Sequence, residues 1–140
     1  MADKYFLDTN ILIYAHDASA GIKHERARLL VQDLWTSGQG VLSTQVLQEL
    51  CVNLRRKVAR PVAMDEIRRL IHDYMSWEVV VNAPGDVIQA LEIEVRYKTS
   101  FWDALILQAA ERAGAAILYS EDLATKQRYG TIRVVNPLSG

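Results

Sequence analysis

Four acidic residues stand at positions from which an α/β sheet would direct them toward one site: Asp8, Glu49, Asp103 and Asp122. Asp8 and Asp122 follow short apolar runs that have the character of strands. Glu49 and Asp103 fall in the first turns of expected helices. In open α/β sheets, such positions converge outside the carboxyl ends of the strands. The four carboxylates are therefore expected to meet.

Carboxylates that meet at one point repel one another unless a cation lies among them. Oxygen ligands without a supporting His or Cys cluster favour Mg²⁺ or Mn²⁺. His16, His24 and His72 lack metal-ligand spacing, which argues against zinc hydrolysis and His-based nuclease chemistry. A divalent cation held by acids offsets the charge of a phosphodiester and lowers the pKa of a water. The chain is therefore expected to hydrolyse phosphodiester bonds.

Each acid also has a purely structural interpretation. Asp8 is suited to cap the short helix that follows it, and Asp122 to cap a turn. Ser100 and Asp103 have the spacing of a capping box, but Asp103 is the only charge from 100 to 110 in a helix that is apolar nearly all round. Such a helix is buried, and a buried carboxylate needs a cation or several donors. Glu49 lies about 135° from the centre of its helix's apolar stripe, as a solvated surface residue also would.

The remaining sequence alternates between strand-like and helical segments, which indicates a parallel sheet covered on both faces. Strands are expected at 5–7, 41–42, 78–81, 115–119 and 131–135, and helices at 10–15, 22–35, 44–58, 62–75, 86–97 and 101–113. At 140 residues, half of them hydrophobic, the chain is expected to form one domain, 1–140. No apolar run reaches the ~18 residues of a membrane span, and Cys51 is the only cysteine. A cytoplasmic protein away from membranes is the expectation.

Taken together, these segments resemble the PIN-domain ribonucleases, and more narrowly the VapC-type toxins of VapBC toxin–antitoxin pairs. The resemblance rests on four motifs in order along the chain, Leu7-Asp8-Thr9-Asn10, Glu49 after Leu42-Ser43, Phe101 to Ile106 around Asp103, and Ser120-Glu121-Asp122. It implies a three-layer α/β/α sandwich with a central parallel sheet, in which the four acids hold one or two Mg²⁺ or Mn²⁺ ions. It also implies an RNA substrate, a small antitoxin partner and a homodimer. Thr9, Asn10 and Ser120 adjoin the acids and are expected to orient a carboxylate or a metal-bound water, although turn chemistry alone would also explain them.

Basic residues that could hold RNA follow Glu49. Arg55, Arg56 and Arg60 cluster there with Lys57, and Arg56 lies seven residues past Glu49 on nearly the same helix face. Such residues would position a strand through its phosphates without reading its sequence, but a solvated helix end would also favour them. Further candidates, with surface solubility as the alternative, are Arg68, Arg69, Lys126 and Arg128. The net charge of −1 gives no support to a generally basic nucleic-acid binder, although an acidic site would mask basic residues elsewhere.

Other functions stay open at this point. A phosphatase with an aspartyl nucleophile also uses acids at strand ends. Such enzymes typically carry a second Asp two residues after the first, and here that position is Asn10, which counts against this function. A housekeeping PIN nuclease of RNA processing would share every motif. A non-catalytic PIN-like binding module is disfavoured because all four acids are present.

Overall fold

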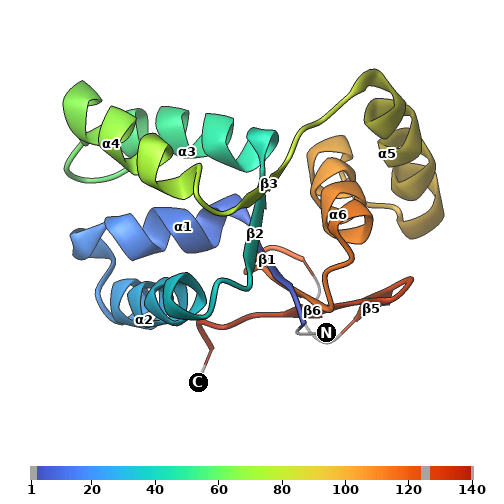
Figure 1. Ribbon diagram of the computed structural model, residues 1–140, viewed down its shortest axis with the longest axis horizontal. Coiled ribbons are helices and arrows are strands. Elements are labelled where there is room, and N and C mark those ends of the chain that lie inside the picture. The colour runs from blue at the N-terminus through green and yellow to red at the C-terminus, as the bar shows by residue number, and fades with distance from the viewer. Residues whose placement is uncertain (1–2, 124–126, 140) are drawn as a thin grey trace.

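The computed structural model describes residues 3–123 and 127–139 of the chain (Figure 1). Its strands are β1 Tyr5–Leu7, β2 Gly40–Ser43, β3 Glu78–Val80, β4 Ile117–Tyr119, β5 Arg128–Tyr129 and β6 Ile132–Val135. Its helices are α1 Thr9–His16, α2 Ile22–Ser37, α3 Thr44–Arg56, α4 Met64–Tyr74, α5 Pro84–Tyr97 and α6 Phe101–Ala113, with a short 3-10 helix, η1, at Ala18–Ala20.

The strands form a single six-stranded sheet in the order β3-β2-β1-β4-β6-β5. All neighbours pair in parallel except β5, which pairs antiparallel with β6 at one edge. β1 lies in the middle, with Tyr5 beside Gly40 of β2 on one side and beside Ile117 of β4 on the other. The carboxyl ends of β1 and β4 are therefore neighbours.

Helices cover both faces of the sheet, as the sequence predicts (Figure 1). α1, α2, α3 and α4 lie on one side, and α5 and α6 lie on the other. The apolar strand residues are buried between these layers, including Phe6, Leu7, Leu42 and Leu118, each with no exposed surface. Burial of this kind is the main favourable term in folding. No helix of the described residues is long and apolar enough to cross a membrane.

Two glycines fit the chain to this arrangement. Gly38 ends α2 in the left-handed region, at φ 72°, where a residue with a Cβ would be strained. Gly40 begins β2 against the indole of Trp77, and a Cβ at this position would overlap the ring.

The observed elements differ from the expected ones at their ends. α5 begins at Pro84, two residues earlier than predicted, because proline suits the first turn and the Asp86 carboxylate accepts a hydrogen bond from the Ala83 backbone N–H at 2.8 Å. α3 ends at Arg56 instead of at residue 58. The antiparallel strand β5 was not expected, since a two-residue strand leaves no periodic pattern in the sequence.

Candidate functional site

The four acids come from four different segments and line one hollow of about 250 Å³. Asp8 directly follows β1, and Asp122 comes three residues after β4. Glu49 lies in α3, and Asp103 lies in the first turn of α6. The sheet and the helices that start at its edge therefore bring together residues separated by up to 114 positions in the chain, from 8 to 122.

Asp8 is the most enclosed of the four acids, with 6% of its surface exposed. One carboxylate oxygen accepts a hydrogen bond from the Thr9 backbone N–H at 2.7 Å, so Asp8 also caps α1. The other oxygen accepts from the Ser120 hydroxyl at 2.8 Å. Burial raises the pKa of Asp8 to about 7; the two hydrogen bonds oppose this rise, and the nearby charges of Asp103 and Glu49 add to it.

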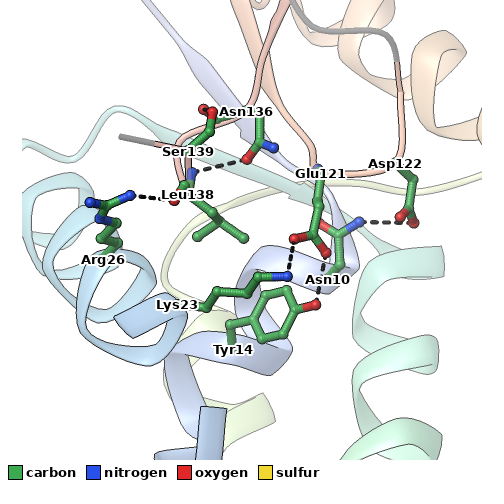
Figure 2. A network of polar contacts seen from close by, with 9 residues as sticks. All are labelled: Asn10, Tyr14, Lys23, Arg26, Glu121, Asp122, Asn136, Leu138 and Ser139. Carbon is green, nitrogen blue, oxygen red and sulfur yellow. Dashed lines mark hydrogen bonds and ion pairs between the residues drawn. The ribbon is translucent and has the colours of Figure 1, made fainter. Parts of the chain in front are cut away.

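Glu49 and Asp122 are each held by a neighbour of Asp8. The Thr9 hydroxyl donates to Glu49 Oε1 at 2.6 Å. The Asn10 side-chain amide donates to Asp122 Oδ2 at 2.9 Å (Figure 2). The segment after β1 thus contacts two acids from distant parts of the chain, in addition to supplying one of its own.

Asp103 lies three residues after Ser100, the residue that caps α6, and it lines the hollow. Its backbone N–H donates to the Ser100 hydroxyl at 3.1 Å, as a helix N-terminus requires. Among the described residues, no bond returns from the Ser100 N–H to the Asp103 carboxylate, so the side chain is not used in a capping box. Partial burial raises the pKa of Asp103, and the charge of Asp122 raises it further.

The turn after β4 is attached to the first two helices through Glu121 (Figure 2). Its carboxylate accepts from the Tyr14 hydroxyl at 2.7 Å and forms an ion pair with Lys23 at 2.6 Å. Although burial acts in the opposite direction, these two donors hold the pKa of Glu121 below its ordinary value. The Glu121 backbone N–H also donates to Asn10 Oδ1 at 3.4 Å. We call this set of residues, Tyr14, Lys23 and Glu121, the Glu121 latch.

The chemistry of the hollow suits a hard divalent cation. Its acidic donors are carboxylates, which are ligands that Mg²⁺ and Mn²⁺ prefer. No three His, Cys, Asp or Glu side chains of the described residues are yet arranged so that they could hold an ion. Burial is the main cause of the raised pKa of both Asp8 and Asp103, and the charges of neighbouring acids add to it. A cation bound among these carboxylates would favour their ionised forms.

Uncharged and basic residues complete the hollow. Its other lining residues are Thr9, Asn10, Ile13, Gln45, Asn53, Lys57, Trp102 and Ile106. Of the basic residues that follow Glu49, Lys57 lines the hollow, whereas Arg55, Arg56 and Arg60 are exposed outside it. Lys126 lies outside the described residues, and Arg128 is exposed in β5.

Sequence reasoning missed Gln45 and Asn53. They lie four residues before and four residues after Glu49, so all three share one face of α3. The helical spacing around Glu49 was the available signal. Trp102 was noticed only as part of a motif, because an exposed aromatic residue next to a buried helix face leaves no mark in the sequence.

Known proteins share this fold and this chain's sequence pattern. The PIN domain family model matches residues 5–129. A toxin–antitoxin complex from Klebsiella pneumoniae is similar in structure, with a TM-score of 0.70 and 20% identity over 96% of this chain and 98% of that one. VapC20 of Mycobacterium tuberculosis, described as a toxin that cleaves the sarcin–ricin loop, has a TM-score of 0.65 and 22% identity over 85% of this chain and 90% of that one.

A DNA-bound VapBC from Salmonella typhimurium is also similar, with a TM-score of 0.63 and 19% identity over 95% of this chain and 97% of that one. No curated protein matches the chain. Because the family model covers most of the sequence, from β1 to β5, the chain belongs to the PIN domain family.

Proposed function

We propose that this protein is an Mg²⁺- or Mn²⁺-dependent endoribonuclease that acts as the toxin of a toxin–antitoxin pair. The observation that carries the proposal is the meeting of Asp8, Glu49, Asp103 and Asp122 around one hollow. None of the described residues that line this hollow is a His or a Cys, and four carboxylates suit a hard divalent cation.

In this proposal, Asp8, Glu49, Asp103 and Asp122 hold the cation. When bound, the cation offsets the charge of a phosphodiester and makes a water more acidic. Ser120 and Thr9 fix two of the acids by hydrogen bonds of 2.8 and 2.6 Å, and Asn10 fixes a third at 2.9 Å. These contacts keep the carboxylates oriented toward the hollow, so less reorganisation is needed when the substrate arrives. Lys57 at the rim would donate hydrogen bonds to a phosphate of the bound strand.

The toxin role is supported by the similar structures. One of them is described as a toxin that cleaves the sarcin–ricin loop, and two others as toxin–antitoxin or VapBC assemblies. By analogy we propose a small antitoxin as a protein partner, a homodimer as the assembled state, and the cytoplasm, where RNA is available, as the place of action.

The proposal is tested with Asp103→Asn, which keeps the shape of the side chain and removes its charge. We expect this variant to fold and to lose at least roughly a hundredfold in cleavage of a mixed RNA pool with Mn²⁺, as is typical when a group that stabilises the transition state is removed. A matched control is Asp65→Asn, because Asp65 also lies in the first turn of a helix but is fully solvated. Asp65→Asn should cleave like the unaltered protein.

Retained cleavage by Asp103→Asn would show that the charge of the Asp103 carboxylate is not needed for cleavage. Cleavage that persists in EDTA would contradict the metal requirement. The toxin role has its own readout: induced expression of the unaltered protein should stop bacterial growth, and expression of Asp103→Asn should not.

A further inference from the structure

A second hollow of about 380 Å³ opens beside the acidic one. The two share Gln45, Glu49, Asn53, Lys57 and Trp102, so they are continuous. Gln48 and Val52 line only the second. We call this second hollow the Trp102 groove. It extends from the carboxylates along α3 and past the start of α6.

The indole of Trp102 is exposed in this groove although tryptophan is a costly residue to leave in water. Trp102 is 60% exposed. Its ring packs edge-on against the Phe101 ring, with 5.2 Å between the two ring centroids. The backbone is fixed as well, because the Gln45 amide donates to the Trp102 carbonyl at 3.2 Å. Trp102 directly precedes Asp103 and lines both hollows, so its indole lies beside the acidic site.

The rest of the groove is polar. Gln45, Gln48 and Asn53 carry side-chain amides, which both donate and accept hydrogen bonds, and Lys57 adds a positive charge. Gln45 Oε1 is buried without a hydrogen-bond partner among the described residues. A buried acceptor of this kind costs free energy unless a donor reaches it. Only Val52 and Trp102 are apolar, so an apolar protein side chain is a poor match for the groove as a whole.

Building on the proposed nuclease function, we propose that the Trp102 groove is a nucleobase subsite for single-stranded RNA. A base next to the scissile phosphate stacks on the Trp102 indole, and its edge meets the amides of Gln48 and Asn53. Lys57 contacts a phosphate of the same strand. Stacking on an aromatic ring accepts any base, whereas the amides would distinguish one base from another. Trp102 is thus a positioning residue, which binds substrate beside the reacting atoms.

The test measures binding in EDTA, where the metal is removed, so it does not depend on cleavage. Fluorescence anisotropy would compare an oligoadenylate of seven nucleotides with a fully abasic ribose-phosphate chain of the same length and charge. The unaltered protein should prefer the adenylate by roughly fivefold or more, the usual effect of one stacked base. Trp102→Leu, which keeps apolar area but loses the π face, should lose that preference. Trp102→Phe should keep most of it.

The controls separate stacking from general effects. Met75→Ala removes another exposed apolar side chain, 65% exposed and outside the groove, and should leave the preference unchanged. The salt dependence should be the same for Trp102→Leu and the unaltered protein, because the phosphate contacts remain.

Three results would overturn the base subsite: no preference for the adenylate in the unaltered protein, equal losses for adenylate and abasic chains in Trp102→Leu, or equal losses in Trp102→Leu and Trp102→Phe. A purified antitoxin bound more weakly by Trp102→Leu, with the adenylate preference intact, would reassign the groove to the protein partner. Failure of the nuclease proposal would appear elsewhere, as an absence of Mn²⁺-dependent cleavage by a protein that still prefers adenylate.

Discussion

At the scale of single residues, Asp8 links proton binding to folding and to cation binding. It is buried, it accepts two hydrogen bonds, and its pKa is raised to about 7, mainly by burial. A cation requires the ionised carboxylate, so binding must displace the proton that Asp8 retains below that pH. Cation affinity is therefore expected to rise as the pH increases through 7.

Without metal, Asp8 should make the protein less stable as the pH rises. The pKa of Asp8 is about 7 in the folded chain against an ordinary value of 3.8, so between these values the folded state binds a proton that the unfolded state has lost. This contribution is complete below about pH 4 and is lost as the pH rises through 7, by on the order of 4 kcal/mol. Urea unfolding in EDTA from pH 4 to pH 8 measures it.

Asp8→Asn is the control for this loss of stability, because Asn does not titrate. The Ser120 hydroxyl can rotate to accept a hydrogen bond from the Asn side-chain amide. The decline between pH 4 and pH 7 should be absent in this variant. Mn²⁺ should raise the thermal midpoint of the unaltered protein at pH 8 and have little effect on Asp8→Asn. An equal decline in both proteins would assign the pH dependence to other groups.

The basic residues at the end of α3 can be ranked by the salt dependence of RNA binding. The sequence places Arg56 near the face of Glu49, but Lys57 is the basic residue that lines the acidic hollow. Lys57→Ala should weaken RNA binding uniformly and lower the log–log salt slope by about 0.7, the effect of one lost phosphate contact on a single strand. Arg56→Ala in the same titration tests the contact predicted from the sequence. A lower slope for Arg56→Ala alone would place the strand on the other side of the helix end.

At the scale of elements, the Glu121 latch connects α1 and α2 to the turn that holds Asp122 (Figure 2). Lys23→Ala removes the ion pair, and the turn should move more freely against Asn10. Because this pair is partly exposed, stability should change only slightly. Cleavage should fall several-fold, mainly in kcat, and Lys23→Arg should restore most of it. The comparison is made by single-turnover kinetics together with thermal melting.

Arg28→Ala is a matched control, since it breaks an exposed ion pair with Glu25 on the same helix without touching the turn. It should leave both stability and cleavage unchanged. Equal losses in Lys23→Ala and Arg28→Ala would mean that the latch acts only through the general charge of α2.

The elements also show what could be predicted from the sequence. Helical and strand periodicity located the buried strands and both helix layers, because those patterns reflect local geometry. The family resemblance then indicated which acids share a site. What the sequence did not reveal is the pairing between distant side chains, such as Thr9 with Glu49, because such contacts depend on how the helices pack on the sheet. The exposure of Trp102 is of the same kind.

At the scale of the whole molecule, α5 lies at one side of the structure, beside α6 (Figure 1), and carries several exposed apolar residues, which we call the apolar stripe. Val87, Ile88, Leu91 and Val95 are 39%, 58%, 46% and 79% exposed. Contiguous exposed apolar surface of this kind indicates an interaction site. A second copy of the same chain would cover it in a symmetric pair, in line with the homodimer that we propose.

Leu91→Glu should therefore convert a dimer into a monomer, because it places a charge in the middle of the stripe. Analytical ultracentrifugation gives the mass of both proteins directly. Gln89→Glu adds the same charge to the same helix outside the stripe and should stay dimeric. A monomer for the unaltered protein at micromolar concentration would leave the stripe to a different partner.

The middle position of β1 has a consequence for the timing of synthesis. β1 is made first, yet one of its two neighbours in the sheet, β4, is not translated until residue 119. Two residues of the site are added in the same late stretch. Asp122 lines the acidic hollow, and Ser120 donates a hydrogen bond to Asp8. A nascent chain that has emerged only as far as α6 thus has neither the finished sheet nor the full set of acids. The nuclease that we propose would therefore lack a complete acidic site until the turn after β4 has been made, so the message and the ribosome that produce it would be spared until then.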